Sequence, residues 1–136
     1  MREILFRGKT EKGEWVFGDL SCMAQRIYIS KFTIDNTYKD GAENTHLYDC
    51  FLVLPETVGQ FTGLTDKNGK KIFEGDIVRN EYLEGKYQYF KVCYDSVIGC
   101  WIAIKKAESN FIYNLIGKIE IIGNIHDNPE LLEAQK

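Results

Sequence analysis

Proline, histidine and long apolar runs are scarce in this 136-residue sequence, which has two prolines and two histidines. A membrane-spanning helix needs about 20 consecutive apolar residues, but the longest runs here, such as residues 51–54, reach four or five. The N-terminus, MREILFRGKT, lacks the apolar segment of a signal peptide. We therefore expect a cytoplasmic protein that makes no use of a membrane.

Closely spaced metal ligands are also missing. The four cysteines, Cys22, Cys50, Cys93 and Cys100, include no C-x-x-C pair. The two histidines, His46 and His126, are not adjacent in sequence to any of the cysteines. A structural zinc site needs closely paired ligands. We expect free, mostly buried thiols, no metal and no cofactor.

The composition is that of a globular protein, with 44% hydrophobic and 27% charged residues in a length typical of one domain. Eight tyrosines, eight phenylalanines and two tryptophans favour strands, because aromatic rings fit a pleated surface. The net charge is −3, and only residues 61–106 are mildly basic, with eight basic and six acidic side chains. Proteins that bind nucleic acid usually show a stronger positive bias.

A sequence pattern occurs twice, as FRGKTEKGEWVFGDL at residues 6–20 and FTGLTDKNGKKIFEGDI at residues 61–77. Aligning the two copies places single-residue insertions at Asn68 and Glu74 in the second. Each copy predicts a β-hairpin, because its strand-like residues flank a glycine-containing turn, which in the second copy is Asn-Gly. The Gly-Asp pair that follows in each copy is expected to bend the chain again.

The second copy could also be mistaken for a ligand-binding loop. An EF-hand loop has glycine at position six and glutamate at twelve, but counting from Asp66 puts Gly69 at four and Ile77 at twelve. A phosphate-binding loop needs a hydroxyl residue after its lysine and then a helix, and neither follows Lys70 and Lys71. We interpret these residues as turn residues, because a turn explains both copies.

Most of the remaining chain alternates as strands do. The expected strands are residues 26–29, 47–54, 76–79, 87–94, 97–104, 111–115 and 118–122. Short strands with frequent turns predict a mainly β fold, a small barrel or sandwich. Asn128 and Pro129 predict a short C-terminal helix. The polar residues 36–46 predict a mobile surface loop.

Three phrases, FRGK…GEWVFG, LPETVGQFTGLTDKNGKKIFEGDIV and IGNIHDNPELL, resemble the YopX family of phage and prophage proteins. The resemblance runs from Arg7 to Leu132, although residues 21–50 carry no recognisable motif. It implies a single domain over residues 1–136 in the host bacterial cytoplasm. Its expected parts are a β-hairpin part (1–57), an SH3-like β part (58–125) and a helical turn (128–134). The resemblance implies no catalytic residue, cofactor or small-molecule substrate.

Catalysis has weak support in the sequence. Nucleophile-elbow, H-E-x-x-H and nucleotide fingerprints are missing. His126 precedes the expected helix as a surface residue would, and Glu74 and Asp76 belong to the repeated bend. We expect no enzyme activity and no catalytic residues.

Two binding functions stay open. Basic residues around aromatic rings are typical of single-strand binders, and the candidate surface consists of Lys67, Lys70, Lys71, Arg79, Tyr82, Lys86, Tyr87, Tyr89 and Lys91. The favoured alternative is a protein-interaction module or homo-oligomer, because small β folds expose edge strands that can pair with another chain. Nucleic-acid binding is the second hypothesis and an enzyme the third.

Overall fold

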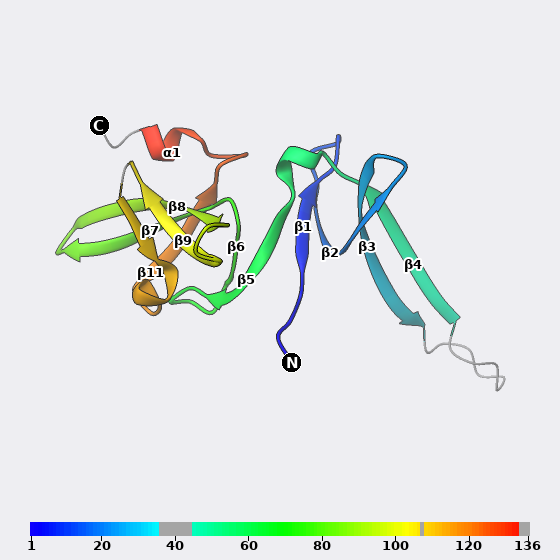
Figure 1. Cartoon of the computed structure of the whole chain (residues 1–136), viewed down its shortest axis with the longest axis horizontal. Coiled ribbons are helices and arrows are strands. Elements are labelled where there is room, and N and C mark those ends of the chain that lie inside the picture. The colour runs from blue at the N-terminus through cyan, green and yellow to red at the C-terminus, as the bar shows by residue number, and fades with distance from the viewer. Residues whose placement is uncertain (36–44, 107, 134–136) are drawn as a thin grey trace. The chain divides into compact units, whose positions relative to one another are not determined.

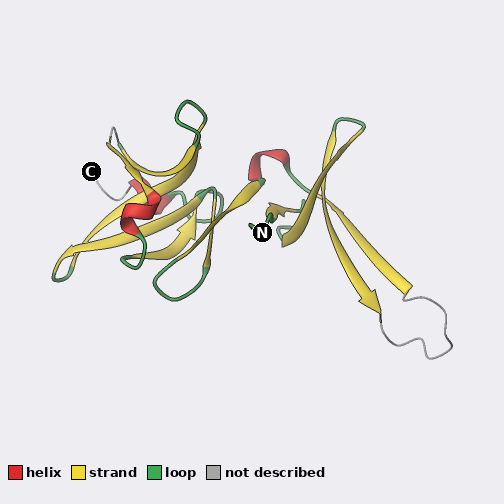
Figure 2. Cartoon of the chain, turned by 60° about the horizontal axis from the view of Figure 1, so that its bottom comes forward, coloured by secondary structure: helices red, strands yellow, loops and turns green. Residues whose placement is uncertain are grey.

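The computed structural model describes residues 1–35, 45–106 and 108–133. It divides the chain into two compact units, an N-terminal unit of residues 3–60 and a C-terminal unit of residues 61–136 with residues 1–2. Strands make up most of both units, and the helical segments are single turns (Figures 1 and 2). The prediction of a mainly β fold is confirmed. No described helix has the length and apolar character needed to cross a membrane.

The N-terminal unit is an antiparallel sheet in the order β4-β3-β2-β1. Its elements are β1 (Phe6–Lys9), β2 (Trp15–Met23), β3 (Arg26–Asp35), β4 (Thr45–Leu52) and the 3-10 helix η1 (Pro55–Thr57). Strand β5 (Gly59–Thr65) begins in this unit, where its first two residues pair with β1, and continues into the C-terminal unit. The expected loop at 36–46 lies outside the described residues except for its last two positions, which belong to β4.

The C-terminal unit contains a five-stranded antiparallel sheet in the order β10-β9-β8-β7-β11. Its elements are β6 (Lys71–Phe73), β7 (Asp76–Leu83), β8 (Lys86–Asp95), β9 (Cys100–Lys105), β10 (Glu108–Phe111), η2 (Ile112–Leu115), β11 (Ile119–Asn124) and α1 (Glu130–Glu133). The rest of β5 pairs with β6. The short C-terminal helix is confirmed at residues 130–133, and residue 134 of the expected turn lies outside the described part.

The C-terminal sheet is open, so the predicted barrel is wrong. Strands β10 and β11 form its two edges, and their described residues do not pair with each other. The chain between these edges contains η2, where the sequence predicts a strand over residues 111–115. Ile112 in η2 is 1% exposed and joins the core cluster. The apolar residues 111–115 therefore contribute the Ile112 side chain to the core and do not form the predicted strand.

One face of the five-stranded sheet carries the main hydrophobic core. The buried cluster consists of Ile72, Val78, Phe90, Val92, Ala103, Ile112 and Ile119. Four partly buried side chains pack against it: Leu64, Trp101, Leu115 and Ile121. The alternation predicted for residues 87–94 is confirmed, since Phe90 and Val92 are buried while Tyr89 and Lys91 are more exposed. Alternate residues of β8 therefore belong to a second, more polar face.

Both predicted hairpins form, and their turns share one hydrogen-bond pattern. In the first, the N–H of Thr10 donates to the carbonyl four residues ahead (2.9 Å), and the N–H of Gly13 donates to Thr10 O (2.9 Å). In the second, Asp66 and Gly69 make the equivalent bonds at 2.8 and 3.0 Å. Thr10 therefore corresponds to Asp66, and the two turns have the same length.

This correspondence corrects the position of the first insertion, which the alignment placed at Asn68. The extra residue lies upstream in β5, where the pairing with β6 shifts register between Phe61 and Thr65. Gly63, within this irregular stretch, has a φ of +85°, as a glycine at a β-bulge does. The insertion is therefore absorbed as a bulge in the strand and leaves the turn unchanged.

The predicted Gly-Asp bend forms only in the second copy. There the chain turns at residues 74–75, and Asp76 Oδ2 accepts a hydrogen bond from the N–H of Phe73 at 2.7 Å. In the first copy β2 runs without interruption through Gly18. A side chain at Gly18 would collide with the carbonyl of Ser30 in β3. Glycine therefore serves there for close approach of two strands and not for a bend.

The cysteines are free, as predicted, but they are not mostly buried. Cys22 and Cys50 are exposed on the N-terminal sheet, while Cys93 and Cys100 are partly buried in the C-terminal unit. The expectation of burial is wrong because the N-terminal sheet leaves much of its surface open to solvent. Burial raises the pKa of the Cys93 thiol, which favours its protonated form.

Candidate binding surface

The basic hairpin of the C-terminal unit is built around one buried carboxylate. Asp66 Oδ1 accepts hydrogen bonds from the backbone N–H groups of Asn68 and Lys70, each at 2.9 Å. Its Oδ2 accepts a third from the N–H of Ile121 in β11, at 3.1 Å. Burial alone would raise the pKa of Asp66, but these bonds outweigh it and the pKa is lowered. The interpretation of these residues as turn residues is confirmed, because both carboxylate oxygens of Asp66 accept hydrogen bonds from backbone N–H groups.

The predicted lysines of this hairpin have different surroundings. Lys67 Nζ lies 3.7 Å from Glu120 Oε2. Lys70 is exposed at the end of the turn, and Lys71 begins β6 with its Nζ 5.4 Å from the centre of the Phe61 ring. Glu120 therefore offsets part of the positive charge that the sequence suggested for the hairpin.

Arg79 connects the hairpin region with the polar face of the sheet. It is the register partner of Glu120 in β11 and of Tyr89 in β8. Arg79 Nε and Nη2 each lie 2.9 Å from Glu120 Oε2, and its Cζ lies 4.5 Å from the centre of the Tyr87 ring. The Arg79 hydrogen bond lowers the pKa of Glu120, and the same bond raises the pKa of Arg79. Since exposed ion pairs stabilise little, the main effect is to place the guanidinium over the ring.

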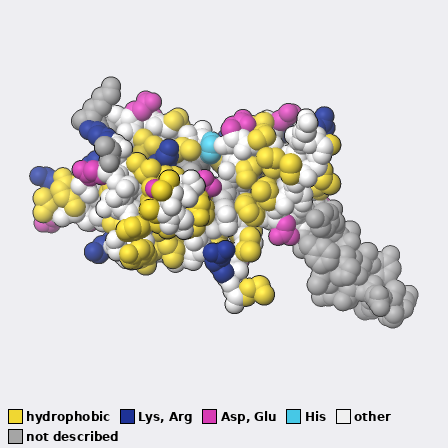
Figure 3. All heavy atoms as spheres, in the orientation of Figure 1, with side chains coloured by type: hydrophobic (Ala, Val, Ile, Leu, Met, Phe, Trp, Pro, Cys, Tyr) yellow, Lys and Arg dark blue, Asp and Glu magenta, His cyan; other side chains and the backbone are white. Residues whose placement is uncertain are grey.

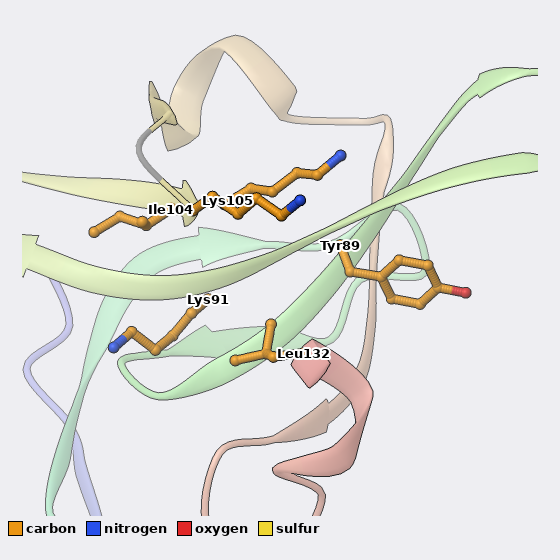
Figure 4. Close-up of a pocket in the computed structure, with 6 residues that line it drawn as sticks. Tyr89, Lys91, Ile104, Lys105 and Leu132 are labelled. Carbon is orange, nitrogen blue, oxygen red and sulfur yellow. The ribbon is translucent and has the colours of Figure 1, made fainter. Parts of the chain in front are cut away.

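Beside this arrangement, β8, β9 and α1 line a pocket of about 220 Å³. Figure 4 shows the lining side chains: Tyr89, Lys91, Ile104, Lys105, Lys106 and Leu132. Tyr89 and Lys91 are two residues apart on β8, and Lys91 is the register partner of Ile104. Two residues of the predicted surface therefore meet lysine and aliphatic side chains from the end of β9 and from α1.

The structure brings together four of the predicted surface residues, Arg79, Tyr87, Tyr89 and Lys91. Tyr82 and Lys86 lie instead near the β7–β8 turn, at the end of the hairpin. The β7–β8 pairing shifts register between Glu81 and Leu83 there, and Tyr82 is 51% exposed.

Sequence reasoning missed Glu120 and the far side of the pocket. The adjacent pair Lys105 and Lys106 was visible as a basic signal, but its position beside Lys91 depends on the β8–β9 register. Leu132 of α1 lines the pocket next to these lysines. No local pattern identified Glu120 as the partner of Arg79.

The described residues were also candidates for a metal site and, at His126, for a catalytic residue. Among them, no three His, Cys, Asp or Glu side chains group so that they could hold a metal ion. His126 lies in the turn before α1, and its backbone N–H donates to Asn124 Oδ1 at 3.0 Å. Asn128 Oδ1 accepts from the N–H of Asn124 at 3.3 Å. Local polar contacts of this kind order the turn that leads into the helix.

Comparisons with known proteins agree with this architecture. A family model described as YopX protein matches residues 5–133, nearly the whole chain. The chain belongs to the YopX family. The resemblance seen in the sequence is therefore confirmed. No curated protein matches the chain significantly.

Among solved structures, this YopX-family chain is similar to the crystal structure of protein EF1440 from Enterococcus faecalis. The two superimpose with a TM-score of 0.60 at 23% identity, over 97% of this chain and 99% of that one. At this identity the likeness establishes a common fold.

Proposed function

We propose that this YopX-family chain is a phage- or prophage-derived accessory protein of the bacterial cytoplasm that acts by binding and not by catalysis. We propose further that its N-terminal sheet associates with a second copy of the chain. Family membership supports the origin. The observation that carries the binding function is the amount of apolar surface that the N-terminal sheet exposes.

The N-terminal unit buries little of its apolar surface. Among the hydrophobic residues at positions 3–31 and 49–60 of this unit, only Ile29 and Val53 are buried, whereas eleven are buried among the described residues of the C-terminal unit. Five large side chains of β2 and β4 are between 38% and 55% exposed: Phe17, Leu20, Met23, Phe51 and Leu52. Figure 3 shows hydrophobic side chains gathered over this sheet. Burial gains about 25 cal/mol per Å² of apolar surface. Two of these five side chains, Phe51 and Leu52, belong to the outer strand β4, where an added strand would bury part of them.

Strand β4 provides an edge to which a second chain could add. It is the outer strand of the sheet, and its pairing with β3 runs over eight residues without a register shift. Its sequence THLYDCFL has no proline or lysine, the residues with which natural sheets protect an edge. Two copies of β4 would also repel little, because Asp49 is the only residue charged at neutral pH when His46 is neutral.

The hydrogen-bond alternation indicates which backbone groups of β4 face outward. Val53 N–H donates to Ile27 O at 3.1 Å, so residues 53, 51 and 49 face β3 in the regular antiparallel pattern. The N–H and carbonyl groups of Cys50 and Leu52 therefore point away from β3, where an added strand would pair. Antiparallel pairing of β4 with β4 of a second copy would give the dimer two-fold symmetry, which is the commonest symmetry of homodimers.

The test is the mass of the full-length protein in solution, measured by light scattering from about 1 to 100 µM. We expect a dimer of twice the 15.7 kDa chain and a monomer for Leu52→Lys, because each interface would then contain two lysines. The matched control is Val97→Lys, which makes the same kind of change at a residue 92% exposed in the β8–β9 turn.

A wild-type monomer over the whole concentration range would contradict self-association and leave a different protein as the partner. Equal dissociation of the Leu52→Lys and Val97→Lys variants would show that added charge, and not the β4 edge, controls assembly. Circular dichroism spectra that match the wild-type spectrum are required of both variants.

A further inference from the structure

We propose that the pocket between β8, β9 and α1 binds one nucleotide of a single-stranded nucleic acid. The adjoining polar face of the C-terminal sheet would carry the flanking strand. This activity is separate from the proposed self-association, which uses the N-terminal sheet. The charge, lining and size of the pocket support it.

The pocket concentrates positive charge. Three of its six lining residues are lysines, Lys91, Lys105 and Lys106, and none is acidic. In the part of the chain that the structure describes, none of these lysines forms an ion pair, although Glu108 is the register partner of Lys105. A phosphate group could therefore bind to any of these ammonium groups through charge-assisted hydrogen bonds.

The remaining wall of the pocket is apolar and aromatic. It consists of the Tyr89 ring and the aliphatic side chains of Ile104 and Leu132 (Figure 4). Its volume of about 220 Å³ is below the range of roughly 300–1,000 Å³ typical of small-molecule sites. A space of this size suits one flat base, which an aromatic side chain can hold by stacking whatever the base.

The arrangement favours a strand over a free mononucleotide. Lys91 and Lys105 point in opposite directions from the pocket in Figure 4. A nucleotide within a strand has a phosphate on each side, whereas a mononucleotide has one. Beyond Tyr89, its register partner Arg79 lies over the Tyr87 ring and continues the basic and aromatic surface. With a net charge of −3, binding should be moderate and should weaken steeply with salt.

The experiment measures fluorescence anisotropy of a labelled 12-residue oligothymidylate titrated with the full-length protein at about 50 and 200 mM salt. Two further arms use a 12-base-pair duplex and, as a competitor, thymidine monophosphate. We expect the single strand to bind, the duplex to bind at least about tenfold more weakly, and the monophosphate to compete poorly. The duplex cannot stack its paired bases on Tyr89, and the monophosphate offers a single phosphate to the lysines.

Three variants locate the site. Tyr89→Leu should weaken binding about tenfold while Tyr89→Phe stays close to the wild type, because only the leucine lacks a stacking ring. Lys105→Gln with Lys106→Gln should weaken binding and reduce the slope of log affinity against log salt by about one for each phosphate that is no longer neutralised. The matched control, Lys12→Gln with Lys118→Gln, removes two exposed lysines outside the pocket.

The proposal is overturned if the oligonucleotide does not bind at about 100 µM protein. It is also overturned if Tyr89→Leu binds as the wild type does, or if the control variant weakens binding as much as the pocket variant. Effective competition by the monophosphate would indicate a mononucleotide site, and equal binding of the duplex would indicate a general electrostatic surface; either result rejects the single-strand site. Unchanged thermal unfolding of the variants ensures that weaker binding does not reflect misfolding.

Discussion

Asp66 accepts a hydrogen bond from the backbone N–H of Ile121 at 3.1 Å, although 55 residues separate the two in sequence. One residue along, Lys67 N–H donates to Ile119 O at 2.9 Å. These bonds attach the β5–β6 turn to β11, an edge strand of the five-stranded sheet. The same carboxylate also holds its own turn through Asn68 and Lys70, so one side chain couples a local turn to the long-range fold.

We predict that Asp66→Ala destabilises the C-terminal unit by about 2–4 kcal/mol, because three backbone donors lose a charged acceptor. Urea unfolding followed by Trp101 fluorescence in a Trp15→Phe background measures this unit. The matched control is Asp95→Ala, since Asp95 Oδ1 also accepts two backbone bonds, but in an exposed local turn. We expect the control to lose less than about 1 kcal/mol; equal destabilisation would refute a special role for the link to Ile121.

The Asp66 carboxylate should also make stability depend on pH. Its pKa in the folded protein lies below the ordinary value of 3.8, so the unfolded chain binds the proton more tightly. The contribution of Asp66 to the free energy of unfolding is complete above its pKa in the unfolded chain. It is lost as pH falls through its lowered pKa in the folded protein. We predict that the stability difference between the wild type and Asp66→Asn is constant from pH 7 to about 5 and shrinks below about pH 4. A difference that persists unchanged at pH 3 would contradict this.

Much of the fold could be predicted because its signals are local. Alternation along residues 87–94 identified β8 and its two faces, and the repeated turns identified both hairpins. The strand predicted at 111–115 failed because a short apolar run does not reveal whether it pairs or only fills a core, and Ile112 fills the core. The insertion was misplaced because sequence similarity cannot distinguish a longer turn from a bulge at Gly63.

The candidate surface was predictable to the extent that one strand defines it. Tyr87, Tyr89 and Lys91 share a face of β8 by their spacing alone. The neighbours that complete the surface come from other strands, and only the pairing register places Arg79 opposite Tyr89. The pocket also needs Leu132 from α1, and no local pattern places that side chain beside the lysines of β8 and β9.

The β2–β3 turn is expected to carry backbone strain that substitution can relieve. Met23 pairs with Arg26, and the two loop residues, Ala24 and Gln25, have φ values of +50° and +64°. A two-residue loop with both φ positive is a type I′ turn, which favours Asn-Gly. We predict that Ala24→Asn with Gln25→Gly stabilises the N-terminal unit by about 1–2 kcal/mol.

Urea unfolding followed by Trp15 fluorescence in a Trp101→Phe background tests this turn. Ala24→Val serves as the control of opposite sign, because a β-branched residue adopts positive φ least readily. If both variants destabilised the unit, the positive φ values would not be the source of strain.

The two repeated hairpins make a final prediction about glycines that are equivalent in sequence. Gly8 and Gly63 align, yet Gly63 has a φ of +85° with no atom within 4 Å of an added Cβ, whereas a Cβ on Gly8 would lie 2.9 Å from the Val53 side chain. Asparagine tolerates positive φ but still needs space. We therefore predict that Gly63→Asn costs less than about 1 kcal/mol and Gly63→Val about 1–3 kcal/mol. Gly8→Asn should cost more than about 2 kcal/mol, because it overpacks a buried contact.

Urea unfolding measures these costs, with Trp15 fluorescence reporting on the Gly8 variant and Trp101 fluorescence on the Gly63 variants. The comparison separates lack of space at Gly8 from positive φ at Gly63. A similar cost for asparagine at both positions would mean that one cause governs both.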